Sequence, residues 1–452
     1  MYLFIIISSI YWGDWTNSGI EELLIRAQKK PTIFTGTSPV KKEELNYFLE
    51  NLDSLKGKST VHRTPTMWLK ERLSIASQNL EVSEWSAGAI EDSLARGFIL
   101  IGKGNKDRII KLFVEGLARF GDSTGEYPSN KWQDFIACDY TKGYIKANIL
   151  NLSLTVGREP IKWGPSPRHT LVLSGSSPPF DLIHGAYQTQ KFKVSFFATQ
   201  LDPLEKINRY FSGHRIEYKI GTCHEVSLLN LGFSEVALFG GEGRFPDLYY
   251  LNPIFFYYPY QWNHKSAVNI IWGLDFNLFL KRIGIYSELM IDDTPYQETK
   301  KGDRPKIGAN LGLRGTLLNN YWLFEYRGVT RWTYDHIIPW QRYTYLGYPI
   351  GHPEGPDFDE FFLGIVHHLS RSIDIISNIS YLREGEGTID EPYPSHFPSD
   401  YWLTGELKHT VQFELGTKWY KLPGFVMTCK AGCIITDEKT FPGLSFLISN
   451  WR

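Results

Sequence analysis

From about residue 108 onward, hydrophobic and polar residues alternate along the chain with a period of two. This is the period of a β-strand, in which successive side chains point to opposite faces. The alternation is clearest from Tyr321 to Trp332 and from Leu403 to Trp419. In the first stretch one face carries aromatic residues, while the other carries Glu325, Arg327 and Arg331. Each stretch therefore predicts a long strand with one apolar face and one charged face.

The length of these strands favours a transmembrane barrel over a globular sheet. Globular strands average ~5–6 residues, whereas a membrane barrel turns apolar side chains toward lipid and polar ones toward its lumen. Trp322 and Trp332 lie ten residues apart on the apolar face, or ~33 Å of strand, which suits two aromatic girdles. We count 17 or 18 strand candidates. Closure favours an even number, so we predict 18 antiparallel strands, with 16 as the alternative.

The connections between these candidates differ in length. Short turns are expected at Lys281-Arg282, Asn319-Asn320, Arg371-Ser372 and Leu422-Pro423-Gly424. Long polar loops are expected at 121–131, 202–208, 293–305, 335–357 and 384–400. Short turns at one end and long loops at the other are typical of outer-membrane barrels.

Before about residue 100 the hydrophobic residues follow a helical spacing instead. Ser18 and Glu21 fit a capping box, in which each side chain bonds the backbone amide of the other residue. Pro31 would end the helix that follows. We predict a helical module over residues 14–100 and the outer-membrane barrel over residues 101–452.

Residues 1–13 form an apolar segment, and Asp14 closes it. The segment is too short to cross a bilayer as a helix, which needs ~20 residues. Three interpretations stay open: the remnant of an export signal, a first buried strand, or a short anchor.

Composition narrows the protein class further. The 452 residues include 14 Trp, 26 Tyr and 28 Phe, yet the mean hydropathy is -0.26. A helical membrane protein would be more apolar, and a disordered chain would lack the aromatic residues. Lys plus Arg is 48 and Asp plus Glu is 49, so the chain has no basic footprint for nucleic acid. Four Cys exclude a small disulfide scaffold.

The sequence carries no specific catalytic, nucleotide or metal motif. The glycine-rich run from Gly240 to Gly243 lacks the Lys and Ser or Thr of a phosphate-binding loop. Asp357, Asp359 and Glu360 could bind calcium, but the spacing of an EF-hand loop is missing. We therefore expect no catalytic residues, no metal and no cofactor.

The most unusual segment runs from Gly157 to Asp181. Its first twelve residues hold three prolines and two glycines, which prevent a helix and interrupt a central strand. Arg158, Lys162 and Arg168 place three cations beside Trp163. One interpretation is a rigid loop folded into the lumen, with its charges paired to lumen carboxylates. The other is a polar and aromatic surface for sugars or anions.

This segment resembles the Wzi family of capsule assembly proteins. The similarity rests on Gly157-Arg158, Trp163-Gly164-Pro165, Arg168, Leu171, Leu173-Ser174 and Pro178 to Asp181. Weaker support comes from Asn230 to Glu235, Leu251 to Pro253, Ile291 to Asp293, Gly351 to Asp359 and Asp14-Trp15. The resemblance implies an outer-membrane barrel of 18 strands with a periplasmic helical module. It also implies a non-enzymatic, lectin-like protein that attaches capsular polysaccharide or exopolysaccharide to the cell surface.

The candidate site combines the residues of these motifs with the aromatic loops. The polysaccharide-binding or lumen candidates are Arg158, Trp163, Arg168, Asp181, Glu235, Trp340, Arg342, Tyr345, His352, Asp357 and Asp359. Aromatic residues in the loops 252–264 and 335–357 could stack on sugars, or could simply belong to the membrane girdle. Two other functions stay open, a transport channel and a glycan-acting enzyme. The expected partners are the polysaccharide and outer-membrane lipid, with the protein as a monomer.

Overall fold

The computed structural model describes residues 37–38, 83–91, 96–104, 110–120, 136–221, 228–280, 282–293, 304–391, 400–421 and 425–451. The predicted segment 1–13 and most of the predicted helical module fall outside these residues, so both stay predictions. Among the described residues, no helix is both long enough and apolar enough to cross a membrane.

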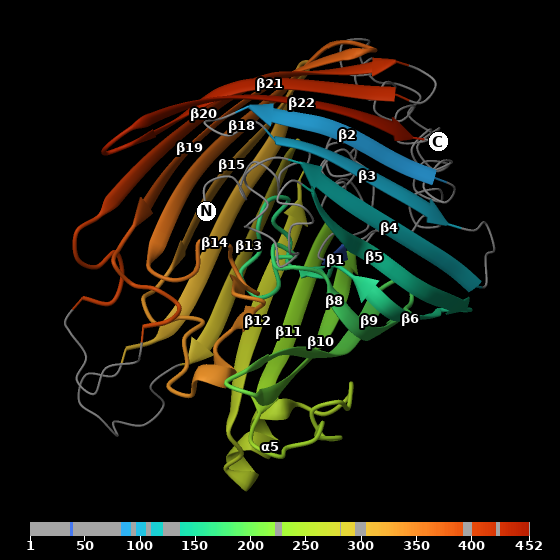
Figure 1. The fold of residues 1–452 in the computed structure, drawn as a ribbon, viewed down its shortest axis with the longest axis vertical. Coiled ribbons are helices and arrows are strands. Elements are labelled where there is room, and N and C mark those ends of the chain that lie inside the picture. Colours follow the sequence, from blue (N-terminus) through green and yellow to red (C-terminus); the bar gives the residue numbers. More distant parts are fainter. Residues whose placement is uncertain are drawn as a thin grey trace.

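The described chain is almost entirely β-structure (Figure 1). The long strands are β2 (Ser83–Glu91), β3 (Arg96–Gly104), β4 (Ile110–Phe120), β5 (Ile136–Ile149), β6 (Leu152–Glu159), β8 (Phe180–Gln188), β9 (Phe192–Leu204), β10 (Ile207–Gly221), β11 (Leu228–Gly240), β12 (Val268–Phe279), β13 (Ile283–Asp293), β14 (Lys306–Leu317), β15 (Asn320–Val329), β18 (Phe358–Ser370), β19 (Ile373–Glu384), β20 (Lys408–Lys421), β21 (Phe425–Thr436) and β22 (Thr440–Trp451). The short elements are β1 (Thr37–Ser38), β7 (Lys162–Trp163), β16 (Thr344–Tyr345), β17 (Tyr348–Pro349), the helix α5 (Tyr257–His264) and the 3-10 helix η3 (Pro339–Gln341).

The long strands form one closed antiparallel barrel of 18 strands, as the sequence predicts. Each strand pairs with the next, and β22 closes the ring on β2, with Glu84 opposite Trp451. The barrel therefore begins at Ser83, earlier than the predicted boundary at residue 101. The reason is that β2 is rich in small residues from Ser86 to Ala89, so its two faces show no contrast between apolar and charged side chains.

The predicted faces of the strands are confirmed. On β13, Tyr286 and Glu288 are buried toward the lumen, whereas Ile283 and Leu289 are exposed on the outer face. Charged residues line the lumen and apolar residues the outer wall, which is the inverted pattern of a membrane-spanning barrel.

Two strand ends differ from the prediction. Strand β15 ends at Val329, and Trp332 is buried with a φ of 62°, so Trp332 does not continue the outer face beyond Trp322. Strand β20 begins at Lys408 rather than at Leu403, which has a φ of 53°. In both places a left-handed backbone conformation turns the chain out of the ladder, and alternation alone does not reveal such a turn.

The connections alternate between the two ends of the barrel. At one end short turns join β5 to β6, β12 to β13, β14 to β15 and β18 to β19. At the other end long connections follow β6, β11, β15 and β19. One predicted long loop is wrong: at 202–208 only Glu205 and Lys206, both with positive φ, separate β9 from β10. The predicted loop 335–357 is confirmed as part of the connection between β15 and β18. The predicted loop 121–131, most of 293–305 and residues 392–399 of the loop 384–400 lie outside the described residues.

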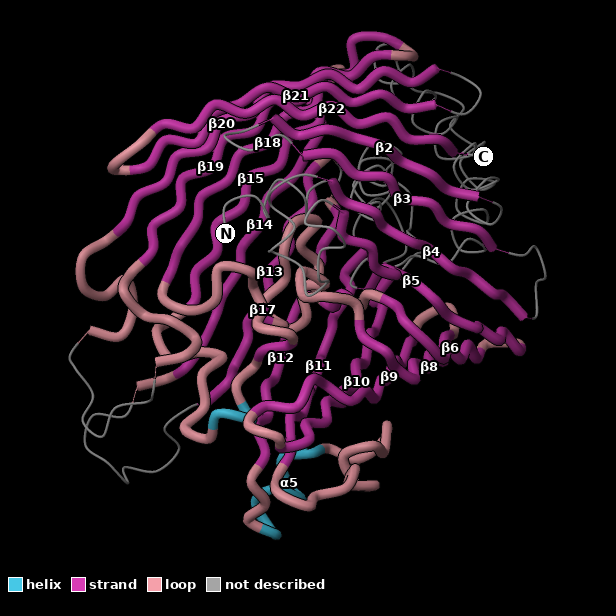
Figure 2. Tube along the Cα trace, viewed as in Figure 1, coloured by secondary structure: helices cyan, strands magenta, loops and turns pink. Residues whose placement is uncertain are grey.

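Two of the long connections fold into the barrel (Figure 2). They are residues 160–179, after β6, and residues 330–357, after β15, and we call them together the plug. Their buried side chains pack with lumen residues of β8 to β12 in one hydrophobic cluster. Strand β7 of the plug also pairs with β1, with Thr37 opposite Trp163.

Candidate functional site

The plug is bound to the barrel wall through a buried carboxylate. Glu288 points into the lumen from β13, and its Oε1 accepts hydrogen bonds from the backbone amides of Leu171 at 3.0 Å and Val172 at 3.1 Å. All three residues are buried. A strand side chain thus replaces the backbone partners that the irregular plug segment cannot provide for itself.

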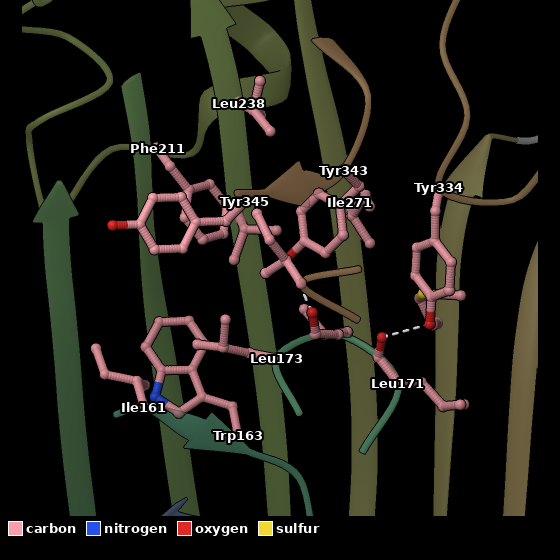
Figure 3. Close-up of a cluster of buried hydrophobic side chains, with 14 of the residues drawn as sticks. Ile161, Trp163, Leu171, Leu173, Phe211, Leu238, Ile271, Tyr334, Tyr343 and Tyr345 are labelled. Atoms are coloured by element: carbon pink, nitrogen blue, oxygen red, sulfur yellow. Dashed lines mark hydrogen bonds between the residues drawn. The ribbon is translucent and has the colours of Figure 1, made fainter. Parts of the chain in front are cut away.

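The two halves of the plug are bonded to each other. The hydroxyl of Tyr334 donates to the carbonyl oxygen of Leu171 at 2.6 Å, and that of Tyr343 donates to Val172 at 2.8 Å (Figure 3). Both tyrosine rings are buried. Because burial disfavours the phenolate, the pKa of Tyr334 and that of Tyr343 lie above the ordinary value, and both hydroxyls stay protonated donors.

Arg209 holds the second half of the plug from the wall. Its Nη2 donates to the carbonyl oxygens of Arg342 at 2.7 Å and Thr344 at 2.8 Å, and its Nε donates to that of Trp340 at 3.0 Å. The side chain is 1% exposed. The planar guanidinium can bond several carbonyls at once, which a lysine cannot do in the same geometry.

A charged network joins the first half of the plug to β15 and β18. Arg168 Nη2 lies 2.8 Å from Glu360 Oε1, and Ser166 donates to Glu325 Oε2 at 2.6 Å. Arg327 pairs with Glu325 and lies 3.3 Å from Glu360. Of the two interpretations of this segment, an inward-folded loop paired with lumen carboxylates thus describes Arg168.

A small cavity of about 20 Å³ lies beside this network, between the plug and strands β18 to β21. It is lined by Arg168, His169, His352, Glu354 and Glu360, with polar side chains of β19 and β20 opposite. Burial and the guanidinium of Arg327 hold the pKa of His169 and of His352 well below the usual range. Burial, with the carboxylates of Glu384 and Glu360 nearby, raises the pKa of Glu354 to about 8. The cavity thus combines two neutral imidazoles with groups of both charges.

The mouth at the long-loop end carries other predicted residues. Trp340 is half-buried on η3. Arg342 Nε lies 3.3 Å from Asp335, and its Nη1 lies 3.2 Å from the exposed Asp390 of the β19–β20 connection. The structure therefore brings an aromatic ring and a paired guanidinium together at the surface of the plug.

Arg158 and Asp181 pair with each other outside the lumen. Their side chains occupy outward positions at the ends of β6 and β8, with Arg158 Nη2 2.6 Å from Asp181 Oδ2 and Nη1 3.2 Å from Asp139. The pair lies on the outer rim of the barrel at the long-loop end.

Two aromatic candidates belong to the core. Trp163 is 2% exposed and packs edge-on against Phe197 at 5.2 Å between ring centroids. Tyr345 is 7% exposed and lies 5.1 Å from Phe180. Neither ring is available to stack on a sugar, because the folding of the plug buries them both.

Asp357 bonds to residues of the β19–β20 connection, and Asp359 of β18 pairs with Arg383 of β19. Asp357 Oδ2 accepts from the hydroxyl of Thr404 at 2.6 Å and from the amide of Gly387 at 2.9 Å. Asp359 Oδ1 accepts from Arg383 at 2.8 Å. No group of three or more potential ligands placed to hold a metal ion occurs among the described residues.

Glu235 lies on the outer face of β11, beneath α5. Its carboxylate accepts from the backbone amides of Tyr257 at 2.7 Å and Tyr258 at 3.1 Å, and from Trp272 Nε1 at 2.8 Å. His214 Nε2 lies 3.3 Å away. This carboxylate therefore caps the first turn of α5. It lies on the outer face of the barrel, whereas the plug network lies in the lumen.

Three residues that hold the plug, Glu288, Arg209 and Tyr334, are not among the candidates predicted from the sequence. For Glu288 and Arg209 a signal existed, since each is a charged residue at an alternate position of a strand. The same signal occurs at many lumen positions, so it could not identify those that reach the plug.

Comparison with known proteins identifies the family of this chain. The model of a family described as capsule assembly protein Wzi matches residues 114–422. No curated protein matches the chain. The solved structure of Wzi from Escherichia coli is similar with a TM-score of 0.70 and 14% identity, covering 95% of this chain and 97% of that one. That protein is described as an outer membrane protein involved in group 1 capsule assembly and as a carbohydrate-binding β-barrel.

Other solved barrels are more distant. The outer membrane protein OpdK of Pseudomonas aeruginosa is 8% identical, with a TM-score of 0.46 and coverage of 81% of this chain and 97% of that one. OprD of the same organism is 10% identical, with a TM-score of 0.43 and coverage of 81% and 94%.

Proposed function

Because this chain belongs to the Wzi family of capsule assembly proteins, we propose that it binds capsular polysaccharide or exopolysaccharide at the cell surface and anchors it there. The proposed location is the outer membrane of a Gram-negative envelope, with the long-loop end outside the cell. The apolar outer wall and the two unequal ends of the barrel support this location.

The observation that carries the proposal is the anchored plug. Glu288 on β13 and Arg209 on β10 bind its two halves to the wall through buried hydrogen bonds. A fixed plug suits a binding surface, because rigid positioning of the contact groups lowers the entropy cost of binding. An open transport channel would instead need a lumen free of such a core.

The mouth formed by η3 and the β19–β20 connection is the proposed glycan surface. Trp340 offers a half-buried ring for the apolar face of a sugar. Arg342 and Asp390 offer donors and acceptors for hydroxyls or a uronic acid. The Arg158–Asp181 pair on the rim could extend the same surface outward.

We propose that this function is non-enzymatic. The buried carboxylates Glu288, Glu325 and Asp357 are already engaged in hydrogen bonds that hold the plug and loops. We also propose a monomer in contact with outer-membrane lipid and without nucleic acid, since the formal net charge of the chain is only -1.

The test is binding of the purified full chain in detergent to extracted capsular polysaccharide or exopolysaccharide. Trp340→Ala should weaken binding at least about tenfold, the effect of losing roughly 1.4 kcal/mol from one aromatic contact. The matched control is Trp419→Ala, because Trp419 is exposed on the outer face of β20 at the short-turn end. The proposal would be contradicted if the wild-type protein did not bind the polysaccharide, or if Trp340→Ala and Trp419→Ala lost the same affinity.

A measurement of ion current distinguishes the proposed binding function from a transport channel. The wild-type protein in a planar bilayer should show no steady conductance, whereas a transport pore would conduct. Turnover of the glycan that stops after a single carboxylate substitution would instead support an enzyme.

A further inference from the structure

Another long connection lies on the outside of the barrel, unlike the two that form the plug. Residues 241–267, between β11 and β12, include α5 and project from the ends of these strands (Figure 1). We call them the β11–β12 excursion. Outward positions on this part of the wall are identified by exposed residues such as Tyr218, Leu231 and Leu274. By alternation, the outward set on β11 also includes Glu235, Ala237 and Phe239.

The excursion covers the extracellular half of this outer wall. Its Tyr250 and Tyr257 form one buried cluster with Phe239 and with other outward residues of β10 and β12. Ser212, also outward, donates to the carbonyl oxygen of Tyr250 at 2.6 Å. Together with the bonds of Glu235 to the first turn of α5, these contacts fix the excursion against the wall.

The free side of the excursion is strongly apolar. Between Leu248 and Asn263 the sequence contains no Asp, Glu, Lys or Arg. The large hydrophobic residues exposed on it, with their exposed fractions, are Phe245 (81%), Leu248 (82%), Ile254 (79%), Phe255 (50%), Phe256 (51%), Tyr258 (38%) and Trp262 (59%). A surface of this kind needs an apolar environment or a partner.

The uncovered wall beneath the excursion is too short for a bilayer. On β11 it runs from Leu228 to Phe233, where Phe256 meets Phe233 at 5.9 Å between ring centroids. Six tilted residues give only ~15 Å of height, whereas the apolar band of a membrane barrel is ~25 Å tall. On β14 the outward residues are apolar or glycine from Ile307 to Leu317, which is ~26 Å on the same scale. The excursion therefore continues the lipid-facing band where the β11 wall stops.

We propose that the β11–β12 excursion is immersed in the outer leaflet and contacts lipid through its exposed apolar side chains. Aromatic residues favour the interface between acyl chains and head groups. Trp262 and Tyr258, with ring centroids 6.4 Å apart on α5, suit that position. In this assignment the aromatic residues of 252–264 anchor the barrel in the membrane and do not bind sugar.

The experiment measures the environment of a nitroxide on the full chain in vesicles of phosphatidylethanolamine and phosphatidylglycerol. The four native cysteines are replaced by serine, and the label is placed by Ile254→Cys on the excursion. Leu311→Cys on the bare wall of β14 is the lipid control, and Asp390→Cys in the β19–β20 connection is the water control. Both control positions are exposed. Folding of each variant is checked by heat-modifiable gel migration.

Oxygen should increase the spin relaxation rate of the label at position 254, and a water-soluble nickel chelate should not. The label at position 311 should behave in the same way. Relaxation by the chelate to the level seen at position 390 would overturn the proposal. Dipolar broadening between labels at position 254, with dimers on cross-linking, would also overturn it in favour of a second copy as the partner. Protection that appears only after polysaccharide is added would overturn it in favour of a glycan surface.

Discussion

Arg209 and Arg342 are joined by a hydrogen bond from the guanidinium of the first to the backbone carbonyl of the second, at 2.7 Å. The two residues lie 133 positions apart in the chain. Because Arg209 belongs to the wall and Arg342 to the proposed glycan surface, this bond sets the position of the mouth relative to the barrel.

Arg209→Ala should release the second half of the plug. The substitution leaves the carbonyls of Trp340, Arg342 and Thr344 without their donor, and hydrogen bonds to charged groups make a net contribution of ~1.5–3 kcal/mol each. We expect faster proteolysis within residues 339–347 and the appearance of ion conductance. Arg209→Lys should restore the protection only in part. An unchanged cleavage rate in Arg209→Ala would contradict the anchoring role.

Glu288→Ala should loosen the first half of the plug. Two buried amides, those of Leu171 and Val172, lose their acceptor, at ~1–3 kcal/mol each. Hydrogen exchange at these amides, followed by mass spectrometry, should accelerate strongly. Glu288→Gln keeps a carbonyl oxygen and should show a much smaller effect. Exchange at the wild-type rate in Glu288→Ala would show that this side chain does not hold the plug.

Glu354 should make the stability of the plug depend on pH. Its pKa is raised to about 8 in the folded protein, above the ~4.3 of a free Glu, so the folded state binds the proton more tightly. The contribution is fully present below pH ~4.3 and is lost as the pH rises toward 8. The thermal midpoint of Glu354→Gln should therefore exceed that of wild type by an amount that grows over this range. Glu205→Gln, in an exposed turn, is the control. A difference that stays constant with pH would contradict the raised pKa.

Glu235→Ala should detach the β11–β12 excursion from the wall. The amides of Tyr257 and Tyr258 and the indole of Trp272 lose a shared acceptor, which costs more than ~1.4 kcal/mol. Chymotrypsin should then cleave within residues 245–262 at least about tenfold faster. Glu242→Ala, on the same excursion but exposed, should leave the rate unchanged. Resistance equal to wild type would mean that other contacts suffice.

Much of the barrel could be predicted because strand faces follow a local rule. Successive side chains of a strand point to opposite faces, so the sequence alone places the charged Glu288 and the apolar Ile283 on opposite faces of β13. Repeating this rule along the chain gives the membrane-type pattern and 17 or 18 strand candidates, from which the even number needed for closure selects 18. The start at Ser83 was missed because the small residues of β2 weaken the contrast on which the rule depends.

The site could be predicted only in part. The unusual composition of residues 157–181 marked a segment that folds into the lumen in part, where Arg168 pairs with Glu360, as one of the two interpretations had it. Trp163 and Tyr345 were candidates for either a glycan surface or the lumen, and both lie in the core inside the lumen. An aromatic residue in a loop looks the same in sequence whether the loop faces solvent, fills a lumen or covers an outer wall.

The sequence by itself thus determined the class of protein, because the alternation of apolar and charged residues is a property of each strand alone. Only the tertiary structure decided that residues 330–357 fold inward, where Tyr334 bonds Leu171 from 163 positions away. It likewise decided that residues 241–267 fold over the outside, onto Glu235. Such choices depend on the burial and hydrogen-bond partners that distant segments provide, and no local period encodes them.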